Sequence, residues 1–382
     1  MDSLAAAGGE KSLVTLLSLL DYEKLDVSLQ LFNYGGEFER YVPSQVKVLE
    51  PFSFIRRLNA RRFDLPILLS RAEYVARCWR KNLKQKTKAR YFWHCFSKYI
   101  PVGQEEYDVA IAYSQCLPTY YVVDKVKAKK KIGWVNCIFH LDGFEKTFNE
   151  GYYRQLNHIV LVSEAAKKHL ESVYPQLREK MTVYPDIVNP YIIKRLAEEP
   201  VPSQVFNEGE GYLRILTVAR LDKDDKGYDI TLEACRLLRD RGLKFRWYAI
   251  GRGPFRAEME DFIKRHELGD TFFFLGTTPN PYCYMRLADI YVQTSRHEGY
   301  GLSIAEARIL NRPVVTTEFD SVYHQMVPGK NGLVVRQNPS DVANAIMQLL
   351  DDRSLYESIV AYQQQEKKGN PEAIEGFYSL LQ

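Results

Sequence analysis

The 382-residue sequence lacks the features that mark secreted, membrane-spanning or zinc-binding chains. It contains no run of 18 or more apolar residues, so no transmembrane helix is expected. Its first apolar stretch, residues 12–20, fits an amphipathic helix and precedes no cleavage-site pattern, which argues against a secretory signal. Its six cysteines form no Cys-x-x-Cys pair and suit neither a zinc site nor a disulfide framework. A reducing, cytoplasmic setting is the simplest interpretation.

What is present is the composition of an ordinary folded protein. Hydrophobic residues make up 46% and charged residues 26% of the chain. Because 382 residues exceed what one hydrophobic core usually serves, two domains are expected. Residues 189–211 are rich in proline, glycine and acids, and this composition predicts a linker between the domains.

Short β-branched or aromatic runs alternate with helical patterns along the whole sequence. Alternation of this kind is typical of parallel sheets with helices on both faces, so the predicted fold class is α/β. Twelve strands are predicted, at 26–32, 46–49, 108–113, 131–135, 159–163, 181–184, 213–218, 245–251, 271–275, 290–293, 313–316 and 332–335.

The net charge of +4 conceals an asymmetry between the two halves. Residues 1–195 contain 30 Lys and Arg against 21 Asp and Glu, whereas the remainder contains 22 against 27. The most basic segment runs from Arg71 to Arg90, with eight cations and the single acid Glu73 among apolar residues near helical spacing. A basic amphipathic helix can bind an anionic membrane surface, and the alternative is a solvated surface helix. No nucleic-acid-binding module is present, so no nucleic acid partner is expected.

The strongest candidate site lies in the segment from Arg296 to Glu306, which follows a predicted strand and runs into a helix. Its glycines let the backbone approach a ligand closely, and the helix N-terminus suits a phosphate. Glu298 and Glu306 bracket this turn, and carboxylates accept hydrogen bonds from vicinal hydroxyls well. One glutamate for a sugar and one for a ribose would fit a nucleotide-sugar. The alternative is an ordinary helix start with acidic residues.

A second loop argues for a phosphate group. Arg220 closes one predicted strand and Lys226 opens the following helix, so both lie at the carboxyl end of a parallel sheet. Two cations there could stabilise the charge that grows on a departing diphosphate. Two further loops, 251–254 with Gly253 and 276–281 with Thr277, leave the same predicted edge, and the latter could line a base pocket.

These residues resemble the motifs of retaining glycosyltransferase family 4, and bacterial polysaccharide and lipopolysaccharide glycosyltransferases in particular. Glu298 and Glu306 are similar to its E-x7-E pattern, and Arg220 with Lys226-Gly227 to its R…KG pair. Gly8-Gly9-Glu10 resembles its N-terminal GGxE loop, with alanines where one or two glycines are usual. The resemblance covers nearly the whole chain and is most specific in residues 213–351.

The resemblance implies a GT-B fold, with two Rossmann-like domains whose parallel sheets face a central cleft. Residues 1–195 would bind the acceptor and residues 196–365 the nucleotide-sugar donor, while a helix in 366–382 would pack back on the first domain. Few residues precede Gly8, so the first strand of that domain is expected to be missing or truncated.

The resemblance also implies an activity: retaining transfer of a hexose-type sugar from a nucleoside-diphosphate sugar, with UDP favoured. The acceptor would be a saccharide or a polyprenyl-linked saccharide in bacterial surface polysaccharide synthesis. No metal or other cofactor is expected, since we expect no Asp-x-Asp motif and no cluster of histidines and aspartates. The implied catalytic residues are Glu298, Arg220, Lys226 and His140. The implied donor-binding residues are Gly8, Gly9, Arg220, Lys226, Gly253, Thr277, Glu298, Tyr300, Gly301, Leu302, Ser303 and Glu306.

Two histidines leave alternatives open. Family members often carry a histidine where this chain has Asn136, so Asn136 substitutes, or His140 reaches the cleft, or the role is absent. His297 either orients Glu298 or faces solvent. Two other functions remain in view: a nucleotide-sugar epimerase of the same architecture, and a non-catalytic sugar-nucleotide-binding partner. A dinucleotide dehydrogenase is excluded by the absence of a Gly-x-Gly-x-x-Gly fingerprint.

Overall fold

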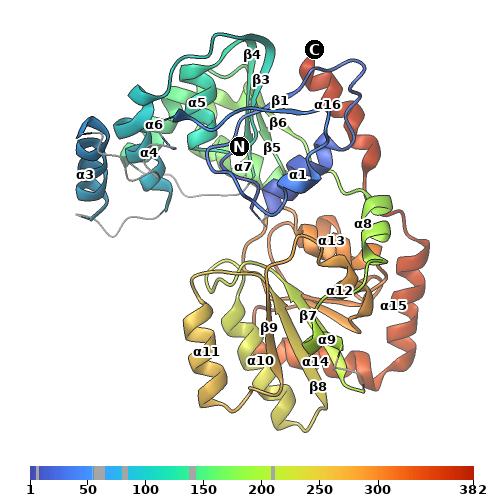
Figure 1. The fold of residues 1–382 in the computed structure, drawn as a ribbon. Helices are drawn as coiled ribbons and strands as arrows, with labels where there is room; N and C mark the ends of the chain where they lie inside the picture. The colour runs from blue at the N-terminus through green and yellow to red at the C-terminus, as the bar shows by residue number, and fades with distance from the viewer. Residues whose placement is uncertain (6–7, 54, 56–64, 80–84, 137–142, 208–210) are drawn as a thin grey trace. The chain divides into compact units, whose positions relative to one another are not determined.

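The computed structural model describes the chain except for residues 6–7, 54, 56–64, 80–84, 137–142 and 208–210. The chain forms two compact α/β units (Figure 1). Unit 1 comprises Met1–Pro185 together with Ile374–Gln382, and unit 2 comprises Asp186–Ala373. The chain therefore leaves unit 1 once and returns to it at the end.

Unit 1 is built on a four-stranded parallel sheet in the order β3-β4-β5-β6. Its strands are β3 (Glu106–Ala112), β4 (Lys127–Val135), β5 (His158–Leu161) and β6 (Met181–Val183). The helices between them are α5 (Leu117–Lys125), α6 (Gly143–Tyr153), α7 (Glu164–Val173) and the 3-10 helix η3 (Pro175–Lys180). The ends of the strands are buried and apolar, for example Ile132 and Trp134 in β4 and all of Ile159–Leu161 in β5.

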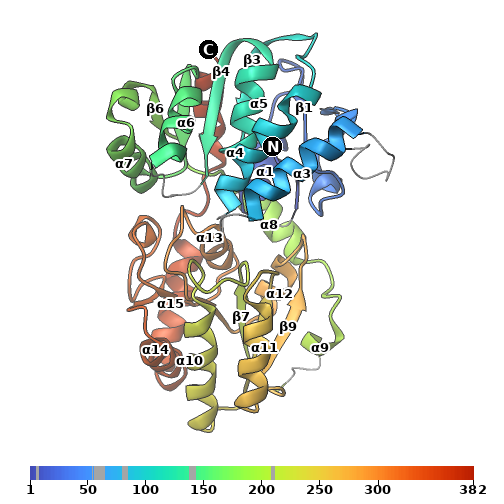
Figure 2. The ribbon, with the colours of Figure 1, turned by 90° about the vertical axis from the view of Figure 1, so that its left-hand side faces the viewer.

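The remaining parts of unit 1 lie around this sheet. They are α1 (Gly8–Leu17), a parallel pair of β1 (Ser28–Leu29) and β2 (Lys47–Val48), η1 (Glu39–Tyr41), α3 (Leu65–Trp79), α4 (Gln85–Phe96), η2 (Ser97–Tyr99) and α16 (Ile374–Leu381). Figure 2 views unit 1 from the side on which α3 and α4 lie. The α16 helix packs on this unit, since the ring centroid of Phe377 lies 6.4 Å from those of both Trp134 and Tyr184.

The structure bears on two expectations at the N-terminal end. No strand is formed by residues 1–4, but they lie beside residues 30–38: the amide of Phe32 donates to Asp2 O (3.1 Å) and that of Phe38 to Leu4 O (2.9 Å). The Leu4 side chain is completely buried. The expected loop at Gly8 and Gly9 is wrong, because both residues belong to the first turn of α1.

Unit 2 is a six-stranded parallel sheet in the order β12-β11-β10-β7-β8-β9, which is the Rossmann strand order. Its strands are β7 (Leu213–Val218), β8 (Phe245–Ile250), β9 (Phe272–Gly276), β10 (Ile290–Gln293), β11 (Val314–Thr317) and β12 (Gly332–Val335). Its helices are α8 (Pro190–Ala197), α9 (Gln204–Asn207), α10 (Tyr228–Asp240), α11 (Arg256–Arg265), α12 (Tyr282–Leu287), α13 (Leu302–Ile309), η4 (Val322–His324), α14 (Pro339–Asp351), α15 (Arg353–Gln365) and η5 (Pro371–Ala373).

The sheet of unit 2 is buried on both faces. Successive side chains of a strand point to opposite faces, so neighbours such as Trp247 and Tyr248 enter different cores. Trp247 packs with the α10 and α14 side, and Tyr248 with the α8 and α12 side. Burial on both faces explains why these strands read as continuous apolar runs rather than as alternating ones.

All twelve predicted strands are present, with bounds that differ by a few residues. The linker predicted in residues 189–211 is wrong in part, because α8 and α9 occupy much of it and pack within unit 2. Asn189 caps α8, accepting hydrogen bonds from the amides of Tyr191 (3.0 Å) and Ile192 (3.4 Å), and Pro190 takes the first helical position. Of the helices that the structure describes, none is long and apolar enough to cross a membrane.

Candidate functional site

The strand order of unit 2 defines a switch point between β7 and β10. The chain continues from β7 toward β8 on one side and from β10 toward β11 on the other, so the loops after these two strands diverge. In open parallel sheets, ligands bind at the carboxyl ends of strands at such a point. The loop after β7 contains Arg220 and Lys226, and the loop after β10 contains Glu298.

The two loops are joined into one surface. The hydroxyl of Thr294 donates to the carbonyl oxygens of Lys226 and Gly227, both at 3.0 Å, and the amide of Arg296 donates to Asp225 O at 2.8 Å. Gly227 begins α10 with a left-handed φ of 62°, and a Cβ there would lie 2.1 Å from Thr294 O. Only glycine permits this approach, so the glycine after Lys226 fixes the distance between the loops.

Lys226 and Glu298 meet across these loops. Lys226 Nζ lies 2.7 Å from Glu298 Oε2, and the two side chains are 20% and 12% exposed. Glu298 Oε1 also accepts hydrogen bonds from Ser295 Oγ (2.7 Å) and Gln293 Nε2 (2.9 Å). The carboxylate is therefore held in one orientation by three donors, one of which is the partly exposed cation of Lys226. His297 is exposed and is none of these three donors.

Arg220 lies in the same loop with different partners. Its guanidinium donates to Asp225 Oδ2 (2.8 Å) and lies 3.6 Å from Asp222 Oδ2, and the side chain is 51% exposed. Asp222 and Asp224 form an Asp-x-Asp pattern, so the expectation that the sequence contains none is wrong. Among the residues that the structure describes, no group of three or more His, Cys, Asp or Glu could hold a metal ion.

Arg296 begins the candidate segment, but the sequence alone assigned it no role. Its two terminal nitrogens donate to the two carboxylate oxygens of Asp229, both at 2.8 Å, and one also donates to Lys223 O at 2.6 Å. Burial opposes ionisation of Asp229, but the hydrogen bonds and charge of Arg296 outweigh it and lower the pKa of that carboxyl. This bidentate pair fastens α10 to the loop after β10. Gln293 and Ser295, which hold Glu298, were missed as well.

The start of α13 faces the same loop. Gly301 precedes the helix with a left-handed φ of 84° and carries no side chain to cap it. Gln325 Nε2 donates to the carbonyl oxygens of Tyr300 and Gly301, which holds the turn from the other side. The first amides of a helix have no intrahelical partner, so those of Leu302 and Ser303 stand at a positive dipole end.

Glu306 is almost completely buried in unit 2. Its side chain is in the second turn of α13 and is 2% exposed. The hydroxyl of Tyr282, in α12, donates to its Oε1 at 3.3 Å. The structure thus brings Lys226 and Glu298 into contact and places Glu306 in the interior of unit 2, against Tyr282.

The other predicted loops lie farther along the sheet, after β8 and β9. A Cβ on Gly253 would lie 2.1 Å from Leu221 O, and Phe255 donates its amide to the same oxygen at 3.2 Å. Gly253 therefore lets the loop after β8 pack against the loop after β7. Thr277 follows β9, the edge strand, and is partly exposed.

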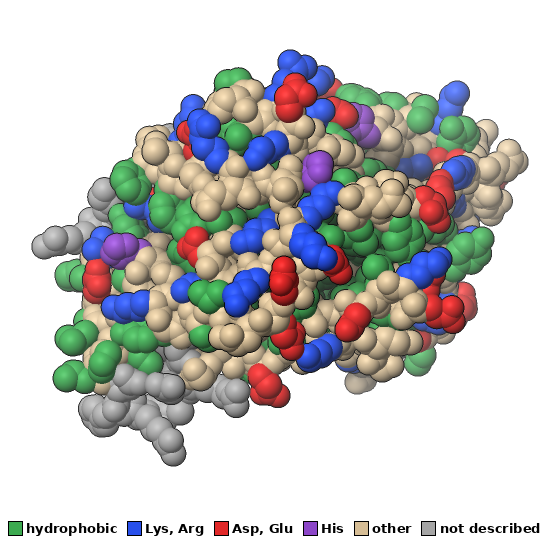
Figure 3. All heavy atoms as spheres, turned by 90° about the horizontal axis from the view of Figure 1, so that it is seen from above, with side chains coloured by type: hydrophobic (Ala, Val, Ile, Leu, Met, Phe, Trp, Pro, Cys, Tyr) green, Lys and Arg blue, Asp and Glu red, His purple; other side chains and the backbone are tan. Residues whose placement is uncertain are grey.

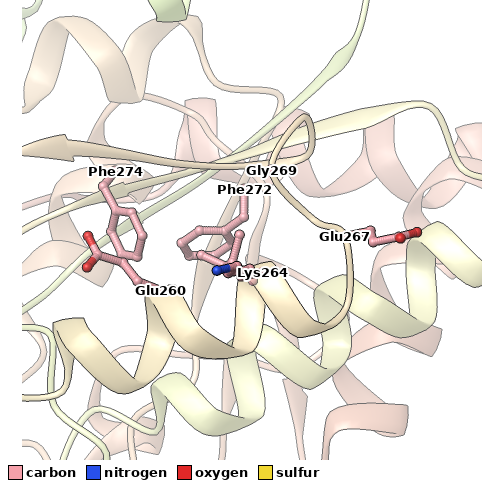
Figure 4. Close-up of a pocket in the computed structure, with 7 residues that line it drawn as sticks. Glu260, Lys264, Glu267, Gly269, Phe272 and Phe274 are labelled. Atoms are coloured by element: carbon pink, nitrogen blue, oxygen red, sulfur yellow. The ribbon is translucent and has the colours of Figure 1, made fainter.

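A groove of about 490 Å³ opens between α11 and β9 (Figure 4). Phe272 and Phe274 project from the strand toward the helix, beside Glu260 and Lys264. The groove lies along the edge of the sheet and contains none of the predicted site residues. The remaining lining residues are Ile263, Glu267 and Gly269.

Of the predicted residues of unit 1, Gly9 and Asn136 lie together at the carboxyl end of β4. A Cβ on Gly9 would lie 2.9 Å from Asn136 Nδ2, so the first turn of α1, which also contains Gly8, packs against this asparagine. Asn136 Nδ2 donates to Tyr113 O at 2.9 Å. His140 lies outside the described residues.

Comparison with known proteins finds similarity to glycosyltransferases. Residues 201–366 match the family model described as glycosyl transferases group 1. Similar proteins include an uncharacterized glycosyltransferase of Methanocaldococcus jannaschii (22% identity; 44% of this chain, 41% of that protein). Another is the putative colanic acid biosynthesis glycosyltransferase WcaL of Salmonella typhimurium (29%; 35% of this chain, 34% of that protein). The chain thus spans less than half the length of these relatives.

Similarity of fold extends over the whole chain. The crystal structure of Anabaena HepE in complex with UDP and glucose matches with a TM-score of 0.66 at 15% identity, covering 100% of this chain and 97% of that one. The expected α/β fold of GT-B type is confirmed by this likeness. The chain is therefore similar to group 1 glycosyl transferases over residues 201–366, and its α/β fold is that of the GT-B glycosyltransferases.

Proposed function

We propose that the chain is a retaining glycosyltransferase that uses a nucleoside-diphosphate sugar, preferably a UDP-sugar, as donor of a hexose-type unit. The observation that supports this most directly is the contact between Lys226 and Glu298 at the switch point of the sheet, beside the start of α13. One cation, one oriented carboxylate and one helix N-terminus suit a diphosphate joined to a polyhydroxylated ring.

In this proposal each group has a distinct task. Lys226, Arg220 and the amides at the start of α13 bind the diphosphate and supply the positive charge needed there without a metal ion. Glu298 accepts hydrogen bonds from sugar hydroxyls, and Glu306 binds the ribose. Since Lys226 and Arg220 contact carboxylates in the structure, donor binding exchanges these partners for phosphate oxygens.

The transfer itself needs no nucleophile from the protein. The bond between the anomeric carbon and the diphosphate oxygen breaks, and its electron pair leaves with the phosphate. The acceptor hydroxyl oxygen bonds to the same face of that carbon and gives its proton to the departing phosphate oxygen, so the configuration is retained. In unit 1, Asn136 or His140 takes the family histidine's role, or the role is absent, and Gly8 and Gly9 allow close approach to the phosphates.

The acceptor in this proposal is a saccharide or polyprenyl-linked saccharide used in bacterial surface polysaccharide synthesis. A similar protein, WcaL, is named for colanic acid biosynthesis, which supports that direction. The proposed setting is cytoplasmic, with the segment from Arg71 to Arg90 at an anionic membrane surface, where a lipid-linked acceptor would lie.

The site assignment can be tested by changing one of two lysines in a single loop. Lys226→Met is expected to weaken UDP-sugar binding about 10-fold or more, because a charge-assisted contact to phosphate contributes roughly 1.5–3 kcal/mol. Lys223→Met is the matched control, since Lys223 is exposed and only its backbone oxygen contacts Arg296. Affinities would be measured by calorimetry with a panel of nucleotide sugars.

Turnover with the same panel tests the reaction. Release of UDP that depends on added saccharide or lipid-linked acceptor is the expected result. Conversion of the donor into an epimer would replace the proposal with an isomerase, and binding without turnover would replace it with a non-catalytic module. Equal affinity of both lysine variants and the unaltered chain would refute the site.

A further inference from the structure

Helix α3, in unit 1, packs through one face only. The ring centroid of Tyr74 lies 6.0 Å from that of Phe92 and 5.9 Å from that of Phe96, both in α4. Ser70 Oγ bonds the hydroxyl of Tyr99 at 3.0 Å, and Ser70 is buried. These contacts fix which side of the helix faces the protein.

The opposite side of α3 is exposed and entirely apolar. Side chains three and four positions apart share a helix face, and this face carries no polar residue over four turns. Its members are Leu65 (67% exposed), Leu68 (38%), Leu69 (63%), Ala72, Val75 (53%), Ala76 and Trp79 (89%). We call these seven residues the outer face. In Figure 3, hydrophobic side chains gather along the border of the molecule where α3 lies.

Cations lie beside the outer face on α3 itself and on the elements that follow it. Arg71 and Arg77 flank it on its two sides, and Lys88 and Lys98, on the neighbouring elements, are exposed. Arg77 is paired with Glu73 at 2.7 Å, which makes Arg71 the net charge of the helix itself. In sequence, the segment from Arg71 to Arg90 still holds eight cations against one acid.

We propose that α3 lies in the surface of an anionic lipid bilayer, with the outer face inserted among the acyl chains and the flanking cations at the headgroups. This inference rests on the membrane-side acceptor of the proposed function and deepens it: the contact is made by apolar insertion together with attraction between the flanking cations and anionic headgroups. A protein partner would usually offer hydrogen bonds, but the outer face presents only the indole N–H of Trp79.

The chemistry of the outer face fits a bilayer interface. Aliphatic side chains fill its middle, and Trp79 stands at one end, where an amphipathic ring suits the headgroup boundary. The 15-residue helix is about 22 Å long, enough to lie in the plane of the membrane with four turns in contact.

Trp79 provides a direct readout. The chain has four tryptophans, and Trp93, Trp134 and Trp247 are 3%, 1% and 0% exposed, so Trp79 dominates the change in fluorescence on binding. With vesicles of phosphatidylglycerol and phosphatidylcholine, its emission is expected to shift to the blue and to be quenched by brominated acyl chains. Vesicles of phosphatidylcholine alone are expected to bind about 10-fold or more weakly.

The double substitution Leu69→Ser, Val75→Ser is expected to reduce vesicle binding about 10-fold or more, because two exposed side chains no longer enter the bilayer. Val48→Ser is the matched control, since Val48 is 45% exposed on β2 of the same unit and outside α3. Circular dichroism checks that both variants are folded.

Three outcomes would overturn the inference. Vesicle binding that the double substitution leaves unchanged, or that leaves Trp79 emission unshifted, would mean adsorption by charge alone. A blue shift without vesicles that grows with protein concentration would assign the outer face to a second copy of the chain. UDP-sugar affinity is measured in parallel. If the unaltered chain bound no UDP-sugar, the proposed function would be wrong, but the vesicle result would remain valid.

Discussion

At the scale of single residues, Glu10 shows how burial sets the charge of a side chain. It lies in the first turn of α1, and burial raises its pKa to about 7, with Asp2 nearby adding to the effect. The folded-state pKa lies above the ordinary value of 4.5, so the neutral carboxyl is the form that suits the fold. Its contribution to stability is complete below about pH 4.5 and is lost as the pH rises to about 7.

Glu10→Gln is therefore expected to remove a pH dependence. Relative to the unaltered chain, the variant should gain up to about 3 kcal/mol in the free energy of unfolding of unit 1 at pH 8, and little at pH 4.5. Urea unfolding at the two pH values measures this. Glu23→Gln, at an exposed position of the same unit, serves as control and should leave the pH dependence as it is. If Glu10→Gln kept the pH dependence of the unaltered chain, the buried carboxyl of Glu10 would not be its source.

The candidate site could be predicted from sequence only where residue type and loop position coincide. Lys226 and Glu298 stand out because each follows or precedes a predicted strand or helix in a loop. From sequence, Gln293 is only the last residue of a predicted strand, so its contact with Glu298 could not be foreseen. The role of Arg296 depends on Asp229, which lies 67 positions earlier in the chain. The depth of Glu306 depends on the packing of α12 against α13, which local pattern does not encode.

At the scale of elements, one glycine decides how two loops of unit 2 meet. Gly227 combines a left-handed φ of 62° with a backbone oxygen, that of Thr294, at 2.1 Å from where a Cβ would be. Gly242, after α10, has a φ of 79° but nothing within 4 Å of that position. Comparing substitutions at Gly227 and Gly242 therefore separates the free-energy cost of backbone strain from the cost of forcing the two loops apart.

Gly242→Ala is expected to destabilise unit 2 by about 1–2 kcal/mol, the usual cost of the left-handed conformation. Gly227→Ala should cost more, because the loops after β7 and β10 must separate, and it should also weaken UDP-sugar binding. Thermal unfolding and calorimetry measure the two effects. Equal stability losses with unchanged donor affinity would show that the close approach of the loops is immaterial.

Strands were easier to predict than the ends of helices. Buried strands of a parallel sheet are continuous β-branched and aromatic runs, so β7, β8 and β10 are visible from composition. Proline misled the interpretation of residues 189–211, because Pro190 opens a helix that Asn189 caps. Gly8 and Gly9 suggested a loop, although glycine is tolerated in the first turn of α1.

At the scale of the whole molecule, both ends of the chain belong to unit 1. The segments by which it enters and leaves unit 2 are hydrogen-bonded together: the amides of Val188 and Asn370 donate to Asn370 Oδ1 (2.8 Å) and Val188 O (3.1 Å). The sequence predicted a helix in 366–382 that packs back on the first domain, but only these long-range contacts define where each unit ends.

Phe377 tests this path, since it is the buried anchor of α16 and is 4% exposed. Phe377→Ala should destabilise unit 1 by about 3–5 kcal/mol, through loss of ring contacts and the cavity left beside Trp134 and Tyr184. Tyr191→Ala, at a side chain of α8 that is 78% exposed, should change stability little.

Calorimetric unfolding with and without UDP identifies which unit responds, because a ligand raises the transition of the unit that binds it. The UDP-dependent transition of unit 2 should keep its midpoint in Phe377→Ala, while the other transition moves down by several degrees. If both transitions fell together, α16 would stabilise the two units jointly, and its assignment to unit 1 alone would be wrong.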